Sequence, residues 1–111
     1  MGVKLPVTAT IARERATRYL LLRQARGDKS AFLELAGYTF QDPDRLLADL
    51  RTQILPLDAA PQQSNKFGQY YEIRGRLKGP NGRVLAIRSI WMTEHLSKIT
   101  KFVTLIPDKS E

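Results

Sequence analysis

The spacing of apolar residues changes once along this chain, and that change limits the fold more than any other feature. Before residue 56 apolar residues recur every three or four positions, as in Leu46, Leu50 and Ile54, which is the period of an amphipathic helix. After residue 66 they alternate with polar residues, as they do on a half-buried strand. This order predicts an α+β domain with two or three N-terminal helices packed on one face of a three- to four-stranded antiparallel meander. At 111 residues the chain has the length of one domain, residues 1–111.

Three helices are predicted within residues 10–55. The first covers residues 11–22, and the second runs from Asp28, a candidate N-cap, to the stop signal at Gly37. The buried side of the second helix would consist of Ala31, Phe32, Leu35 and Ala36. The third has the clearest ends: Asp42 can cap it, Pro43 suits the first helical position, and Pro56 stops it. Leu50, on its apolar stripe, is therefore expected in the core against the sheet.

The sheet is predicted within residues 67–107, after a proline-containing loop at residues 56–66. Strands at 67–77 and 83–92 are joined by a tight turn at Gly-Pro-Asn-Gly, residues 79–82, and a last strand covers residues 100–107. Residues 3–7 can add a fourth strand only at an edge, because Pro6 has no N–H to donate.

Positive charge is concentrated at the two ends of the chain. The net charge is +7, from 18 Lys and Arg against 11 Asp and Glu. Residues 1–30 and 64–111 are basic, whereas residues 31–63 are acidic. If the two basic ends meet in the fold, their surface attracts polyanions such as RNA or an acidic protein, although many small proteins are basic without a specific partner.

Cysteine is absent, and the start of the chain lacks the apolar stretch of a signal peptide. The longest apolar run, residues 19–22, is far too short to span a bilayer. We therefore expect a cytoplasmic protein with no membrane partner.

Arg88 is the most informative single residue, because it lies among apolar neighbours on a predicted central strand. Counting back from the turn at residues 79–82 places it opposite Ile73. A charged side chain in such surroundings needs a partner. Three interpretations stay open: a structural ion pair with Glu72 or Glu94, a bulge that turns Arg88 outward, or a site that binds phosphate.

The same count places Arg74, Arg76 and Tyr70 on the opposite face, with Trp91 beside Tyr70. Arginines with aromatic rings on one sheet face are typical of single-stranded RNA binding, where charge holds the backbone and rings stack on bases. The competing interpretation is a core tryptophan and solvated arginines.

Two further residues are candidates for binding or proton transfer. Lys29 stands at a predicted helix start and can contribute to an anion site, or simply be solvated. His95 is the only histidine, and histidine suits acid–base catalysis near neutral pH, although a lone histidine in a turn is commonly surface decoration. One histidine without cysteine makes no zinc site, and the glycines form no nucleotide-binding fingerprint, so no metal or cofactor is expected.

Several short motifs resemble those of a family of small bacterial proteins classed as a domain of unknown function. They are Lys-Leu-Pro at 4–6, Tyr-Leu-Leu at 19–21, Gly-Asp-Lys-Ser at 27–30, Ala-Gly-Tyr-Thr at 36–39, Phe-Gly-Gln-Tyr-Tyr-Glu-Ile at 67–73, Gly-Pro-Asn-Gly at 79–82, Arg-Ser-Ile-Trp at 88–91 and Phe-Val-Thr-Leu-Ile-Pro at 102–107. The resemblance covers residues 4–108 and implies no catalytic residues, because the family has no established activity. In layout the chain also resembles RelE-type and barnase-type ribonuclease toxins, which cleave RNA without a metal by means of basic and aromatic side chains. A shared layout does not imply a shared function.

The sequence thus leads to two functional hypotheses. The first is an RNA-binding domain, in its sharper form a metal-independent endoribonuclease of toxin type. Arg74, Arg76 and Arg88 would hold phosphate, Tyr70 or Tyr71 would stack or donate a proton, and His95 or Lys29 would transfer protons. The second is a non-catalytic module that binds an acidic, inhibitor-like protein.

Overall fold

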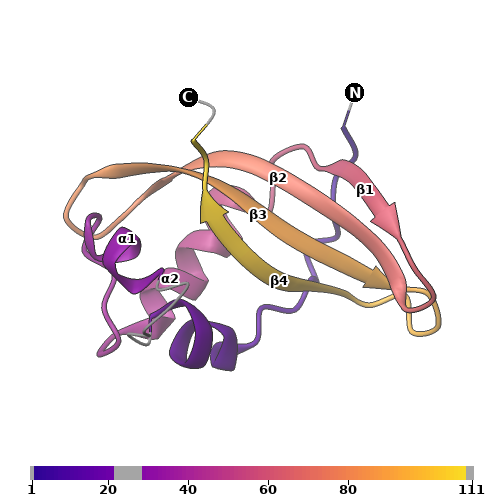
Figure 1. Cartoon of the computed structure of the whole chain (residues 1–111), viewed down its shortest axis with the longest axis horizontal. Coiled ribbons are helices and arrows are strands. Elements are labelled where there is room, and N and C mark those ends of the chain that lie inside the picture. The colour runs from indigo at the N-terminus through magenta and orange to yellow at the C-terminus, as the bar shows by residue number, and fades with distance from the viewer. Residues whose placement is uncertain (1, 22–28, 110–111) are drawn as a thin grey trace.

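The computed structural model describes residues 2–21 and 29–109 and shows an α+β chain whose helices come mostly before its strands. Its four strands form one antiparallel sheet in the order β1-β2-β3-β4, so the predicted fold class is confirmed at that level. The helical elements are η1 (Arg15–Leu20), α1 (Ser30–Glu34), α2 (Pro43–Asp49) and η2 (Leu50–Ile54). The strands are β1 (Ala60–Ser64), β2 (Gly68–Lys78), β3 (Val84–Glu94) and β4 (Thr100–Pro107). Figure 1 shows the helical segments on the same side of the sheet.

The third predicted helix is confirmed as the continuous pair α2 and η2. Pro43 occupies the start, although the Asp42 side chain makes no capping hydrogen bond. The last turns are π-helical, with the Leu55 N–H donating to the Leu50 carbonyl oxygen at 2.9 Å, and the helix ends before Pro56. Of its predicted apolar stripe, Leu46, Leu50 and Ile54 are fully buried and Leu47 is partly buried. The first predicted helix, residues 11–22, begins later than expected and is wound as a π-helix over Arg15–Leu20. Its predicted last residue, 22, lies outside the described residues.

For the second predicted helix, the set of residues predicted to be buried is partly wrong. Leu33 and Ala36 are buried, whereas Ala31 is exposed and Leu35 is 45% exposed. The helical period fails here because α1 has only five residues and the chain then turns at Gly37, whose φ is +93°. The proposed cap, Asp28, lies outside the described residues.

The fourth strand is β1, and not residues 3–7. The expected loop at 56–66 contains β1, which pairs Ala60 with Glu72 and Pro61 with Tyr71. Pro61 is tolerated because β1 is an edge strand. Of residues 3–7, which were predicted as an edge strand, Val3 alone forms a β-bridge, an isolated antiparallel one to Ala59.

The hairpin joining β2 and β3 is confirmed, but its predicted register is wrong by one residue. Arg88 lies opposite Arg74, and Ile73 lies opposite Ser89. The prediction assumed a two-residue turn, whereas Gly79 donates its N–H to the Arg83 carbonyl oxygen at 3.0 Å, leaving a three-residue loop. Gly82 closes that loop with φ +89°, a left-handed conformation that suits glycine.

The core lies between the helices and one face of the sheet. η2 comes so close to β2 that a Cβ on Gly75 would stand 3.0 Å from the Ile54 Cδ1. Ile73, Leu77 and Ile87 contribute fully buried side chains from the sheet. Because alternate residues face opposite ways, the other face of β2 and β3 carries the polar row that the sequence analysis singled out.

Candidate nucleic-acid interface

Glu72 organises the open face of the sheet. Its side chain is only 8% exposed, and its two carboxylate oxygens accept hydrogen bonds from Arg74 Nε at 3.0 Å and Arg88 Nε at 2.7 Å. Burial alone would raise the pKa of Glu72, but the two arginine hydrogen bonds and charges outweigh it and lower the pKa. The ion-pair interpretation of Arg88 is therefore confirmed, with Glu72 as the partner.

The register correction also gathers the sheet arginines on one face. Because Arg88 pairs with Arg74, it shares that face with Arg76, which pairs with Ala86. Tyr70 belongs to the same row and lies half-buried opposite Met92. Tyr70 and Arg88 are four register steps apart, about 13 Å along the sheet at ~3.3 Å per residue.

Trp91 faces the core and not the open face, which corrects its predicted place beside Tyr70. It pairs with Tyr71 and has no exposed surface. Its indole N–H donates to Ser89 Oγ at 2.8 Å, and its ring meets Phe102 edge-on with centroids 5.2 Å apart. A side chain enclosed in this way cannot stack on a base.

His95 stands apart from the arginines, in the turn between β3 and β4. It is exposed, and its Nε2 lies 2.9 Å from the Asn65 carbonyl oxygen. It lies seven positions after Arg88 along the chain, about 23 Å of extended strand at ~3.3 Å per residue. The structure therefore does not bring His95 and Arg88 into one centre.

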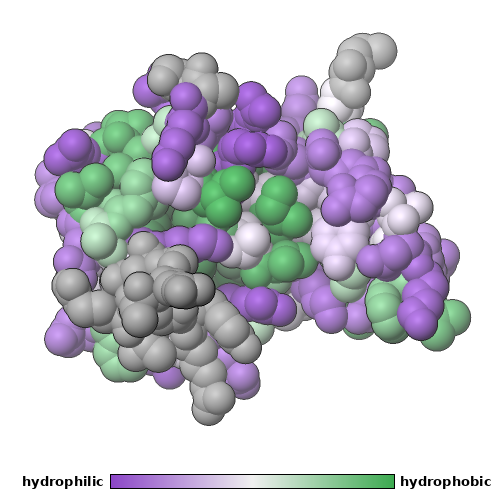
Figure 2. Space-filling model, in the orientation of Figure 1, coloured by the Kyte–Doolittle hydropathy of each residue, from purple (hydrophilic) through white to green (hydrophobic). Residues whose placement is uncertain are grey.

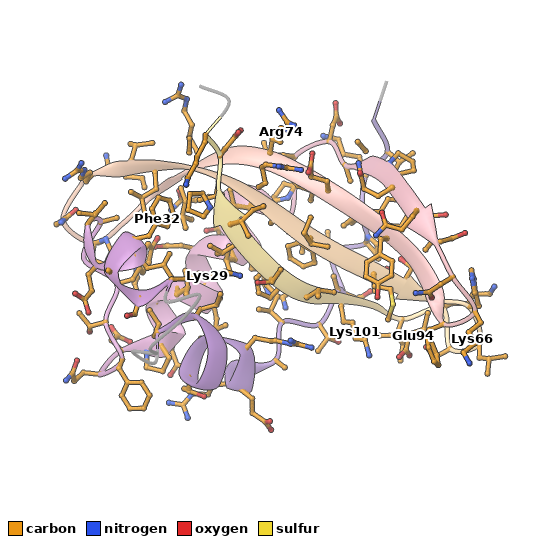
Figure 3. The ribbon with its side chains drawn as sticks, viewed as in Figure 1. Lys29, Phe32, Lys66, Arg74, Glu94 and Lys101 are labelled. Atoms are coloured by element: carbon orange, nitrogen blue, oxygen red, sulfur yellow. The ribbon has the colours of Figure 1, made fainter. Side chains whose placement is uncertain are left out.

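Lys29 lies beside β4, where it meets a residue that the sequence analysis did not single out. Figure 3 shows Lys29 next to β4. Its Nζ donates to Thr104 Oγ1 at 2.8 Å, a contact between residues 75 positions apart. Lys29 is half-buried, and burial lowers the pKa of its ammonium group. Within residues 2–21 and 29–109, no carboxylate pairs with Lys29.

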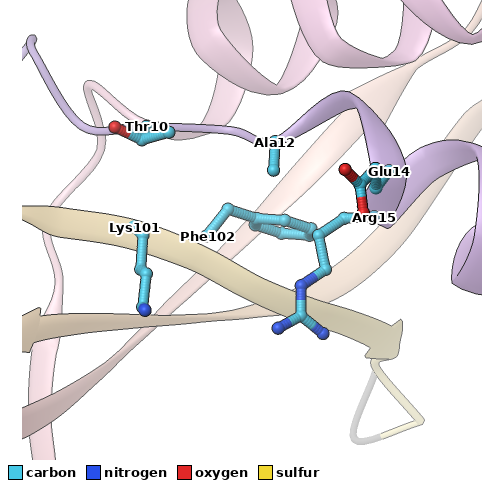
Figure 4. Close-up of a pocket in the computed structure, with 6 residues that line it drawn as sticks. All are labelled: Thr10, Ala12, Glu14, Arg15, Lys101 and Phe102. Atoms are coloured by element: carbon cyan, nitrogen blue, oxygen red, sulfur yellow. The ribbon is translucent and has the colours of Figure 1, made fainter.

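A depression of about 300 Å³ lies at the start of β4, between that strand and the segment leading into η1 (Figure 4). The segment is held there by Thr10, whose N–H donates to the Thr100 carbonyl oxygen at 2.8 Å. Arg15 and Lys101 line the depression and extend to the same side of it. Lys101 also pairs with Glu94 at 2.9 Å.

These groups form one line along β4, which we call the β4 strip. Lys101, Thr104 and Ile106 pair with alternate residues of β3, ending with Ile106 opposite Arg88. The strip consists of these three β4 residues with the basic side chains beside them, Arg15, Lys29 and Arg88. From Lys101 to Ile106 it extends about 17 Å at ~3.3 Å per residue. Figure 2 shows apolar side chains over β4 in the middle of this face, with hydrophilic groups around them.

Comparison with known families agrees with the motif resemblance. A family model described as a domain of unknown function, DUF6883, matches residues 5–109. The chain belongs to this family. No curated protein and no solved structure matches it.

The matched DUF6883 region contains the whole β4 strip and the Glu72 cluster. The family description carries no activity, so any function has to be argued from these side chains. Among the described residues of this DUF6883 chain, no three His, Cys, Asp or Glu side chains are grouped as metal ligands would be. Nor does any described helix have the length and apolar character needed to cross a membrane.

Proposed function

We propose that this DUF6883 domain binds single-stranded RNA along the β4 strip. The observation that carries the proposal is the half-buried Lys29 ammonium, which is hydrogen-bonded to a neutral hydroxyl and has no carboxylate partner among the described residues. A cation that has lost part of its water without gaining a counter-ion is stabilised by an incoming anion. The matching anion is a phosphate oxygen, which accepts from both an ammonium and a hydroxyl group.

The surroundings of Lys29 extend this site in both directions. Lys101 and Arg15 lie toward one end of the strip and Arg88 toward the other. Positive side chains that lie on and beside one strand suit a phosphate backbone, and apolar surface between them suits the faces of bases. The net charge of +7 favours the same partner by attracting polyanions at long range.

The sharper form of the proposal is RNA cleavage without a metal, as in ribonuclease toxins, and it places the domain in the cytoplasm. In that reaction the ribose 2′-hydroxyl attacks the adjacent phosphorus. Arg88 is a suitable source of positive charge, because the Glu72 contact fixes its position while its side chain stays 37% exposed. Arg74 and Arg76 lie on the same face and would hold neighbouring phosphates. Tyr70 would stack on a base or donate a proton, and the distant His95 takes no part.

Binding of a fluorescently labelled oligouridylate of about 12 nucleotides, followed by anisotropy at two salt concentrations, tests the proposal. Wild-type affinity should fall steeply with salt, because bound phosphates release counterions. Lys29→Ala should weaken binding. It should also reduce the slope of the logarithm of the binding constant against the logarithm of salt concentration by about 0.7 per lost phosphate contact. Lys4→Ala is the matched control, since it removes the same charge from an exposed lysine paired with Asp58. Equal losses in both variants, or no binding at low salt, would reject the β4 strip as an RNA site.

An acidic protein partner is the alternative, and a separate surface favours it. At the turn between β3 and β4, Leu96 is 98% exposed and Phe67 is 65% exposed, beside Lys66 and Lys98. Exposed apolar groups bordered by lysines fit an acidic partner with an apolar anchor. If this alternative holds, Leu96→Asp should abolish co-purification with an acidic protein encoded beside the gene, whereas Lys29→Ala should not.

A further inference from the structure

Lys29, Thr104 and Arg88 come from three elements and lie in the half of the β4 strip that runs from Thr104 to Ile106. Lys29 precedes α1 and bonds to Thr104 Oγ1 on β4. Thr104 pairs with Ile90, two residues along β3 from Arg88. Diagonal neighbours of this kind lie about 7–8 Å apart, which a long side chain can bridge. The Arg88 guanidinium is bonded to Glu72 on β2, so in the proposed site a phosphodiester group bound by Lys29 and Thr104 would lie between β4 and that guanidinium.

We infer that this is the place where RNA is cleaved, with Lys29 as the acid that protonates the departing 5′-oxygen. This inference rests on the proposed function, since it requires RNA on the β4 strip. Thr104 is a positioning residue, because its hydroxyl holds the ammonium group toward the strand. Arg88 supplies positive charge to the phosphate as negative charge builds up on its oxygens.

The reaction balances without any further cofactor. The 2′-oxygen forms a bond to phosphorus, and its proton passes to solvent hydroxide. The bond between phosphorus and the 5′-oxygen breaks, and that oxygen takes a proton from the Lys29 ammonium. The products are a 2′,3′-cyclic phosphate and a 5′-hydroxyl, and water returns the proton to the neutral amine.

Lys29 suits this role better than the other candidates. An acid works best when its pKa lies near the working pH, and burial moves the pKa of Lys29 downward in that direction. A guanidinium group, such as that of Arg88, does not give up its proton in proteins. His95 lies about 23 Å of strand away from Arg88 at ~3.3 Å per residue.

Two substrates separate proton donation from phosphate binding. The first is an oligouridylate, whose 5′-alkoxide needs a proton to leave. The second is uridine 3′-(p-nitrophenyl phosphate), whose phenolate leaves as a stable anion. Lys29→Met, which keeps the apolar stem, should lower cleavage of the oligouridylate by about 10²–10⁴-fold. Cleavage of the aryl ester should fall far less.

Further variants make the result decisive. Lys29→Arg keeps the charge and should still bind the oligouridylate, but it should not restore its cleavage. Lys66→Met is the matched control and should cleave both substrates as wild type does. Melting curves for each variant confirm folding. If Lys29→Met is unstable, the Thr104 variants replace it as the test. Thr104→Ser retains the hydroxyl group and should keep activity, whereas Thr104→Val removes it and should lose activity.

Three outcomes would overturn the inference. Equal losses on both substrates would make Lys29 a binding group only. Wild-type cleavage by Lys29→Arg would remove the acid role. RNA binding by the wild type without cleavage would refute the reaction and leave the proposed binding function intact, whereas absence of RNA binding would refute that function itself.

Discussion

Arg88 lies directly across the β2–β3 hairpin from Arg74, and the two guanidinium groups share the carboxylate of Glu72. Two like charges facing each other on a sheet are destabilising unless an anion lies between them. Glu72 therefore holds the two arginines together on the open face. The same arrangement makes the position of Arg88 depend on Glu72.

Replacement of Glu72 by Gln should destabilise the fold by about 1–3 kcal/mol, because a nearly buried charge partner of two arginines is lost. Urea denaturation of both proteins at neutral pH measures the difference. Glu14→Gln, at an exposed position, is the matched control and should change stability by less than about 0.5 kcal/mol. Equal effects of the two substitutions would contradict the role given to Glu72.

The same carboxylate predicts how stability depends on pH. Folding lowers the pKa of Glu72. Its ionised form therefore stabilises the fold at pH values above the pKa that a glutamate has in an unfolded chain, about 4.3. That contribution is lost as the pH falls through the lower pKa of the folded protein. Melting temperatures between about pH 5 and pH 3 should therefore fall more steeply for wild type than for Glu72→Gln. Parallel curves would show that Glu72 does not contribute.

The helix stripe gives a test of the core with a control of the same chemistry. Leu50 is fully buried in η2, whereas Leu35 is 45% exposed after α1. Leu50→Ala should cost about 2–5 kcal/mol of unfolding free energy, because it leaves a cavity against the sheet. Leu35→Ala should cost less than about 1 kcal/mol by denaturant titration. A loss below about 0.5 kcal/mol for Leu50→Ala would mean that this face is misplaced.

Much of the fold is predictable because its signals are local. The helix over α2 and η2 is marked by Asp42, Pro43 and Pro56 within fourteen residues of one another, and the hairpin by Gly-Pro-Asn-Gly at residues 79–82. The edge strand β1 carried no such signal. All five of its residues are exposed, so no alternation of apolar and polar residues appears.

The site is less predictable because it depends on distant pairings. One extra residue in the hairpin loop moved Arg88 from Ile73 to Arg74, and a single step reverses which residues share a face. The contact between Lys29 and Thr104 joins two residues 75 positions apart, and no local sequence pattern links them. Net charge and the choice of Lys29 as a candidate could be derived from the sequence, whereas its partner could not.

Tyr38 links the loop after α1 to α2 and β2. Its hydroxyl donates to Asp49 Oδ2 at 2.7 Å and lies 3.2 Å from the Lys78 carbonyl oxygen. Burial, together with the Asp49 contact, raises the pKa of Tyr38, so the phenol stays protonated. Tyr38→Phe should cost about 1–2 kcal/mol, because among the described residues Asp49 then retains only its hydrogen bond from Arg45. Tyr70→Phe, on the open face, is the control for thermal melting and should change stability little. An unchanged melting temperature for Tyr38→Phe would show that the buried hydroxyl group contributes nothing to stability.

The comparison of Arg88 with His95 joins the fold to the proposed chemistry. Arg88→Ala should reduce oligouridylate cleavage more than His95→Ala, because Arg88 lies beside the Lys29–Thr104 pair and His95 lies in the exposed turn. Arg88→Ala should also lower stability by about 1–3 kcal/mol, since Glu72 loses one of the two arginine partners that the described part of the chain gives it. Melting curves define a temperature at which both variants are fully folded, and cleavage rates are compared there.

Arg88→Lys separates charge from geometry: a lysine should restore part of the rate but not the shared contact with Glu72. A folded Arg88→Ala protein with wild-type cleavage would mean that the two arginines serve only to hold the sheet face together. A large loss in His95→Ala would instead move the reacting centre to the turn between β3 and β4.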